Sequence, residues 1–291
     1  MQLGKRAVWA PTDGMNADDL AAFAQRIEAW GYSALWIPDA MGRDPMVAAS
    51  WMLANTKDLI LATGIANIYS RDVSTMKAAQ VALIEQSGGR FLLGLGVSHQ
   101  PLVEGVRGHE YLAPIPTMRN YLEGLSAAQF MGQPAPEEPS TVIAALGPKM
   151  LELAKTHAQG AHPYLVPPEH TVQAKEILGD EAWLCVEQKV LFETDAATAR
   201  ATARQMLGIY LAMPNYRNNL KRCGFNDEDF ENNGSDRLID AVIAWGDADS
   251  IAARIKEHED AGATQVCVQA LNPAGGAVPD ERILEILAPG K

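Results

Sequence analysis

Residues 59–99 read LILATGIANIYSRDVSTMKAAQVALIEQSGGRFLLGLGVSH, and this stretch decides the fold. Its first residues, 59–62, form an apolar run of the length of a buried strand. Small and polar residues follow from Thr63 and Gly64 onward, which predicts that the strand ends there. Polar groups are therefore expected at the carboxyl end of this strand.

A helix and a second strand are predicted after it. Residues 74–86 have a helical spacing of apolar side chains, with Ser74 or Thr75 as the expected N-cap. Residues 91–97 form a second buried strand, followed directly by Ser98-His99. Because such a strand–helix–strand unit has a right-handed crossover, the polar residues after both strands should lie side by side, where parallel α/β proteins bind ligands.

The same alternation extends over the whole chain. Strand patterns occur at residues 5–9, 33–37, 59–62, 91–97, 141–145, 160–165, 183–191 and 265–270, with helical patterns between them. Residues 196–245 are the exception, and we interpret them as an insertion of two or three helices before the last strand. The pattern predicts a (β/α)8 TIM barrel, of the α/β class, with this helical insertion. A doubly wound open sheet is the alternative, but 94–96 (Gly-Leu-Gly) lacks the third glycine of a dinucleotide-binding fingerprint and no helix follows it.

Composition limits the classes of partner. The chain has 291 residues with 47% hydrophobic composition and no internal linker, so we expect a single domain over 1–291. A net charge of -12 without a basic cluster argues against binding to nucleic acid or to an anionic membrane. The first residues lack the apolar core of a signal peptide, and no apolar run approaches the roughly 20 residues of a membrane span, so we expect a cytoplasmic protein. Cys185, Cys223 and Cys267 are odd in number and far apart, which favours reduced thiols.

Residues at the carboxyl ends of the predicted strands mark where a site should lie. They are Trp9, Asp39, residues 64–69, Ser98, His99, Gly147, Pro148, residues 162–164, Glu193 and Asn272. These positions locate a site but do not identify a reaction. No H-E-x-x-H, C-x-x-C or His-x-His pattern indicates a metal, and no nucleophile elbow or P-loop is present.

Five of these residues have both a functional and a structural interpretation. A helix beginning at Gly147-Pro148 offers free amides for a phosphate, but it is equally an ordinary turn with proline in the first helical position. Asp39 could orient a ligand or accept its proton, or it could cap the following turn. His99 and His162 could each act as a general acid or base near neutral pH, or be hydrogen-bonded structural residues.

Four stretches together are similar to one known family. They are Trp-Ile-Pro-Asp at 36–39, LATGIAN at 61–67, GRFLLGLGVSH at 89–99 and AALGPKM at 144–150, in this order. With these motifs the chain resembles the bacterial luciferase-like flavin monooxygenase superfamily, and within it the branch that uses the deazaflavin coenzyme F420. The resemblance implies a barrel whose third strand ends in a bulge with a non-prolyl cis peptide behind the cofactor ring.

The resemblance also implies which residues hold the cofactor. The cis bond would join Gly64 and Ile65, Asp39 and Asn67 would hydrogen-bond the ring or its ribityl chain, and Ser98 would lie beside them. The cofactor phosphate would lie among Ala145, Leu146, Gly147 and Pro148. In some relatives a histidine that assists hydride transfer follows the strand-two aspartate, but here that residue is Ala40. The expected catalytic acid or base is therefore His99 or His162.

The resemblance thus implies an F420-dependent oxidoreductase that passes a hydride between the deazaflavin C5 and a small organic substrate, as a homodimer. A monooxygenase that uses reduced FMN and oxygen is the nearest alternative. A flavin-binding barrel without catalysis is another. A lyase or hydrolase without a redox cofactor is the most distant, because the strand ends lack a metal pattern or paired carboxylates.

Overall fold

Eight parallel strands close into a ring in the computed structural model, which describes residues 1–290. They are β1 (Arg6–Trp9), β2 (Ala34–Ile37), β3 (Ile60–Thr63), β5 (Phe91–Gly96), β6 (Thr141–Ile143), β7 (Gly160–Ala161), β8 (Trp183–Phe192) and β10 (Gln265–Leu271). Each strand pairs with the next, and β10 pairs with both β8 and β1, which closes the ring. The predicted (β/α)8 barrel is confirmed.

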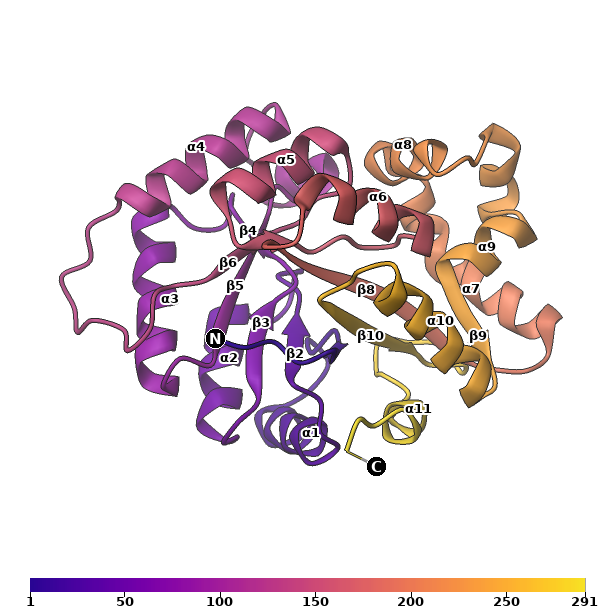
Figure 1. Ribbon diagram of the computed structural model, residues 1–291, viewed down its shortest axis with the longest axis horizontal. Coiled ribbons are helices and arrows are strands. Elements are labelled where there is room, and N and C mark those ends of the chain that lie inside the picture. Colours follow the sequence, from indigo (N-terminus) through magenta and orange to yellow (C-terminus); the bar gives the residue numbers. More distant parts are fainter. Residues whose placement is uncertain (291) are drawn as a thin grey trace.

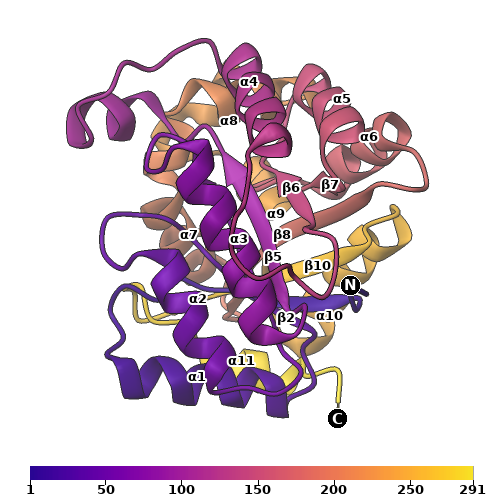
Figure 2. The same cartoon turned by 90° about the vertical axis from the view of Figure 1, so that its left-hand side faces the viewer.

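Helices cover the outside of this ring (Figures 1 and 2). They are α1 (Ala17–Ala29), α2 (Pro45–Ala54), α3 (Val73–Ser87), α4 (Pro114–Ala127), α5 (Pro148–His157), α6 (Pro168–Leu178), α10 (Ala248–Asp260) and α11 (Glu281–Ile286). Asp72 caps α3, since its carboxylate accepts a hydrogen bond from the Thr75 amide at 2.9 Å. The expectation of Ser74 or Thr75 as N-cap was wrong, because the carboxylate two residues earlier satisfies a free amide of the first turn.

Two short elements interrupt the loops at the carboxyl ends of β3 and β5. The two-residue strand β4 (Ala66–Asn67) pairs with the end of β5. A single π-helical turn, η1 (Pro101–Val106), follows His99. Both lie on the side of the barrel where the polar strand ends gather.

The insertion before the last strand forms a separate helical group beyond β8, on the right of Figure 1. It consists of α7 (Ala196–Leu211), α8 (Pro214–Arg222), the 3-10 segment η2 (Asp227–Asn233) and α9 (Asp236–Val242). The predicted helices are confirmed, but the last residues of the tract were wrongly assigned to a helix. They form the strand β9 (Ile243–Gly246), which pairs with 189–192 of β8.

β9 forms along an edge of β8 that the short strand β7 does not cover. β8 has ten residues, whereas β7 has two and pairs only with Trp183 and Leu184. The predicted strand at 160–165 is shorter in the structure and ends at Ala161, two residues before Pro163, which has no amide hydrogen for the ladder. The backbone groups in the carboxyl-terminal part of β8 then need another hydrogen-bonding partner, and β9 is that partner.

The inside of the barrel is apolar at its amino end and polar at its carboxyl end. A cluster that includes Ala7, Ala34, Trp36, Cys185 and Cys267 fills the interior. The described cysteines are all free. Over residues 1–290, no helix is both long and apolar enough to cross a bilayer, and no cluster of three metal-ligating side chains is found.

Candidate functional site

The Gly64–Ile65 peptide bond directly follows β3 and is cis, as the resemblance implied. The Asp39 amide donates to the Ile65 carbonyl at 3.1 Å, and the Trp9 indole Nε1 donates to the Gly64 carbonyl at 3.0 Å. A Cβ on Gly64 would lie 2.6 Å from that indole nitrogen, so only glycine fits between β3 and Trp9. The bulge is therefore tied to β1 and to the segment that follows β2.

Asp39 is at the centre of a charged cluster just past β2. Its Oδ2 accepts hydrogen bonds from the Asn67 amide at 3.1 Å and from Arg71 Nη1 at 2.7 Å, and its Oδ1 accepts one from Arg107 Nη2 at 3.1 Å. Arg71 also pairs with Asp44. The Asp39 side chain is only 7% exposed, so two guanidinium groups hold a nearly buried carboxylate at the mouth of the barrel. Sequence reasoning missed the contacts of both arginines with Asp39, because they lie in loops whose direction no strand pattern fixes.

Asn67 carries a buried donor without a partner. Its Oδ1 accepts a hydrogen bond from the Tyr69 amide at 2.9 Å, which orients the side chain. Its Nδ2 is buried and has no hydrogen-bond partner in the described structure. Buried polar groups are nearly always satisfied, and an orphaned one calls for an explanation such as a ligand acceptor. This observation fits the expected contact between Asn67 and a cofactor.

The start of α5 has the features of an anion site. Gly147 is its N-cap without a side-chain cap, and Pro148 is the first helical residue. A Cβ on Gly147 would lie 3.2 Å from Nη2 of Arg222, which reaches over from α8 of the insertion. His170 of α6 hydrogen-bonds the Leu146 carbonyl at 2.8 Å and fixes the turn. Pro148 has no amide hydrogen and the Met150 amide donates to the Gly147 carbonyl at 3.0 Å, which leaves the Lys149 amide and the helix dipole beside the guanidinium. This combination suits a phosphate, and the sequence did not reveal Arg222.

The two histidines lie in different environments. His162 is inside the barrel, 2% exposed, and stacks on Trp36 with ring centroids 4.4 Å apart. Its Nδ1 lies 2.7 Å from the Cys185 carbonyl, and its buried Nε2 has no partner. Burial lowers the pKa of His162 to about 4, so the ring is neutral at neutral pH.

His99 instead faces the insertion. It follows β5, is partly buried, and its ring lies 5.5 Å from that of Tyr216 on α8. Burial lowers the pKa of His99 too. Ser98 beside it has a positive φ of 57°, and its carbonyl accepts a hydrogen bond from the Tyr111 hydroxyl at 3.3 Å. Both histidines directly follow or lie near the carboxyl end of a strand, and His99 is the more exposed of the two.

Sequence reasoning also missed an ion pair inside the barrel. Lys189 Nζ lies 3.1 Å from both carboxylate oxygens of Glu187, and both side chains are buried in β8. Burial raises the pKa of Glu187 and lowers that of Lys189 to about 8. The signal was present, since two charges two residues apart in an apolar strand share the inner face.

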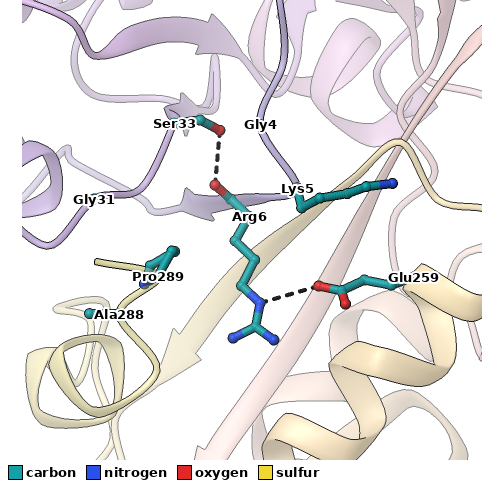
Figure 3. A pocket seen from close by; sticks show the side chains of 8 residues that line it. All are labelled: Gly4, Lys5, Arg6, Gly31, Ser33, Glu259, Ala288 and Pro289. Carbon is teal, nitrogen blue, oxygen red and sulfur yellow. Dashed lines mark hydrogen bonds and ion pairs between the residues drawn. The ribbon is translucent and has the colours of Figure 1, made fainter. Parts of the chain in front are cut away.

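Two surface hollows adjoin the barrel. One of about 500 Å³ lies beside Arg71, and its lining includes Tyr69, His109 and Tyr121. The other, of about 460 Å³, lies at the amino end of β1 (Figure 3). There Arg6 Nε pairs with Glu259 at 3.2 Å, and the Ser33 hydroxyl donates to the Arg6 carbonyl at 2.9 Å. Because barrel enzymes act at the carboxyl ends of their strands, we place the candidate site at the Asp39 end.

The sequence matches a known protein family and individual known proteins. A family model described as luciferase-like monooxygenase matches residues 1–265. A protein of Mycobacterium tuberculosis provisionally named a coenzyme F420-dependent oxidoreductase is 25% identical, over 93% of this chain and 94% of that protein.

Solved structures share the fold. The coenzyme F420-dependent tetrahydromethanopterin reductase of Methanopyrus kandleri has a TM-score of 0.78 at 18% identity, covering 100% of this chain and 98% of that one. The oxygenating constituent of 3,6-diketocamphane monooxygenase from Pseudomonas putida, in complex with FMN, has a TM-score of 0.71 at 13% identity, covering 98% and 97% of the two chains. At these identities the likeness concerns the fold alone.

Proposed function

Because the chain belongs to the luciferase-like monooxygenase family, we propose that it is an oxidoreductase that uses coenzyme F420 and passes a hydride to or from a small organic substrate. The observation that carries this proposal is the similarity over almost the whole chain to the mycobacterial relative named for coenzyme F420. The site supports it with an unpartnered buried donor on Asn67 and with the start of α5 at Gly147, which has no side-chain cap. The deazaflavin, when bound, supplies the hydride chemistry at its C5.

In this proposal the chain binds and orients the cofactor. The backbone of Gly64 and Ile65 lies behind the ring, with Asp39, Asn67 and Ser98 around it. Asn67 Nδ2 donates to a ring or ribityl oxygen, which satisfies the orphaned amide. The segment 145–148, which contains Ala145, Leu146, Gly147 and Pro148, surrounds the phosphate, and Arg222 neutralises part of its charge.

We assign the proton step to His99, the more accessible of the two predicted histidines. A neutral imidazole at the strand end can accept a proton from a substrate hydroxyl as the hydride leaves, and can return it in the reverse direction. Burial favours this neutral form of His99. His162 has the same chemistry available at Nε2, but Trp36 and the barrel wall enclose it.

Replacing each histidine separates these assignments. We expect His99→Ala to lower turnover about 100-fold or more, because general acid–base catalysis contributes that much, while the F420 dissociation constant stays within about twofold. His162→Ala tests the other predicted carrier with the same two measurements. Full turnover in both variants with intact cofactor binding would contradict both assignments.

A titration with F420 and with FMN, each oxidised and reduced, tests the cofactor. We expect saturable binding of F420, followed by its visible absorbance, and substrate-dependent bleaching or recovery of that absorbance with a panel of alcohols and carbonyl compounds. Binding of FMN alone, with oxygen consumption on reduction, would instead support the monooxygenase alternative, which the FMN-bound structure of the same fold favours. Cofactor binding without turnover of any donor or acceptor would support a flavin-binding barrel.

A further inference from the structure

Aromatic rings from five parts of the chain gather between the strand ends and the insertion. Trp9 of β1 and Tyr164 after β7 have ring centroids 5.3 Å apart, and Tyr164 lies 5.6 Å from Tyr210 of α7. Tyr216 of α8 lies 6.3 Å from Tyr164 and 5.6 Å from Tyr210. His99 closes the group at 5.5 Å from Tyr216. We call these five residues the ring cluster.

Beneath the ring cluster lies an ion pair in which the positive and negative charges balance each other. Lys189 Nζ lies 3.5 Å from the centroid of the Tyr164 ring and shares its hydrogen bonds between the two oxygens of Glu187. The Leu165 amide donates to the same carboxylate at 3.0 Å. A ligand above this floor meets no uncompensated charge, so a charged ligand would lose its hydration without gaining a counter-ion.

One edge of the ring cluster carries hydrogen-bonding groups for an oxygen. The Tyr164 hydroxyl donates to Gln269 Oε1 at 3.0 Å and lies 3.2 Å from the Tyr210 hydroxyl. Gln269, on β10, accepts this bond through its Oε1, and its amide nitrogen makes no hydrogen bond to the described residues. A ligand oxygen that takes the place of Tyr210 at this edge meets a hydroxyl and a free amide donor.

We propose that the ring cluster is the substrate subsite and that it takes neutral, flat, unsaturated compounds that carry an oxygen, such as hydroquinones, quinones or conjugated enones. The flat skeleton packs among Trp9, Tyr164 and Tyr216, and its oxygen lies against Tyr164 and Gln269. Flat rings suit walls that already pack ring against ring at these spacings. The assignment deepens the proposed function and rests on it, since the hydride must cross between the cofactor and a substrate held here.

Calorimetric titration with three probes tests this subsite. They are 2-naphthol, which is flat, neutral and carries an oxygen; cyclohexanol, which is not flat; and 2-naphthoate, which is charged. We expect 2-naphthol to bind about tenfold or more tightly than either of the others. Tyr164→Phe should weaken 2-naphthol binding about three- to tenfold, the effect of one hydrogen bond.

Two further variants complete the test. Tyr32→Phe is the matched control, because it removes a buried hydroxyl that donates to the Leu284 carbonyl near the amino ends of the strands. It should leave 2-naphthol binding unchanged. Gln269→Leu removes the amide donor and should weaken 2-naphthol binding as much as Tyr164→Phe does. It takes the place of Tyr164→Phe in the test if Tyr164→Phe does not fold.

Equal affinity for the three probes, or unchanged 2-naphthol binding in Tyr164→Phe and Gln269→Leu, would overturn the subsite. F420 binding is followed separately by its absorbance. Retained F420 binding without probe selectivity overturns the subsite alone. Probe selectivity without F420 binding supports the subsite and contradicts only the proposal that F420 is the cofactor.

Discussion

Asp39 shows how much one side chain organises at the mouth of the barrel. It joins the end of β2 to Arg71 after β4 and to Arg107 after η1, two loops that are far apart in sequence. Each arginine brings a positive charge to the place where the cofactor is proposed to bind. The carboxylate therefore positions the loops as well as lying among the proposed contacts of the cofactor.

We expect Asp39→Asn to lower the free energy of unfolding by about 2 kcal/mol, because hydrogen bonds to charged groups are lost while two guanidinium groups remain. Urea denaturation measures the change. Asp180→Asn is the control, since Asp180 pairs with Lys175 at 3.1 Å but is 94% exposed, and its loss should leave stability unchanged. Equal unfolding free energies for wild type and Asp39→Asn would contradict the structural part of this role.

His162 should make the protein sensitive to acid. Its pKa is about 4 in the folded protein and about 6.5 in an unfolded chain, so the unfolded state binds one more proton in the window between them. The free energy of unfolding therefore falls as the pH falls from about 6.5 to about 4. Burial lowers the pKa of His258 to about 3, which acts in the same direction.

Replacement of His162 isolates its share of this dependence. In His162→Gln the slope of unfolding free energy against pH should become shallower by up to about 1.4 kcal/mol per pH unit between pH 4 and 6.5. Urea denaturation at a series of pH values measures both slopes. Identical slopes in the variant and the wild type would show that His162 is not held neutral by the fold.

At the scale of single elements, the start of α5 depends on a helix of the insertion. α5 provides amides and the positive end of its dipole, whereas Arg222 arrives from the end of α8. Neither element alone has both the free amides and the charge that a phosphate prefers. The insertion thereby becomes part of the proposed cofactor site and of the substrate subsite.

We expect Arg222→Gln to raise the dissociation constant of F420 about tenfold, because the guanidinium would no longer face the phosphate. Lys221→Gln is the matched control, since the neighbouring lysine pairs with Asp227 on the exposed side of α8. Fluorescence titration of the cofactor measures both. Equal weakening in the two variants would indicate general electrostatic attraction rather than a phosphate contact.

At the scale of the whole molecule, α2 has an outer apolar face that the described chain covers only in part. Its inner side, with Met46, Ala49 and Met52, is buried against the barrel. On its outer side Val47 is 65% exposed and Trp51 43% exposed, one helical turn apart. A helix that is apolar on all sides is normally buried on all sides, so we propose that a second copy of the chain covers α2.

The double variant Val47→Asp, Trp51→Glu should therefore be a monomer under conditions in which the wild type is a dimer. Sedimentation velocity measures the state of each. Ile209→Glu, on the exposed side of α7, is the control and should remain a dimer. A wild-type protein that sediments as a monomer at all concentrations would contradict the proposal.

The sequence by itself determined the repeating part of this protein. Apolar runs such as 91–97 indicate buried strands, and turn residues separate these runs. The barrel, and the positions of Asp39, Asn67 and Gly147 at its strand ends, could therefore be predicted from the local sequence pattern. The helices of the insertion followed in the same way.

Only the tertiary structure decided what those positions contact. Arg71, Arg107 and Arg222 reach the site from loops or from the insertion. β9 pairs with β8 where β7, which ends at Ala161, leaves part of β8 without a partner. His162 and His99 are alike in sequence, yet one is enclosed by Trp36 and the other faces Tyr216. Local pattern reports which residues follow a strand, whereas burial, partners and charge depend on segments that meet only when the ring closes.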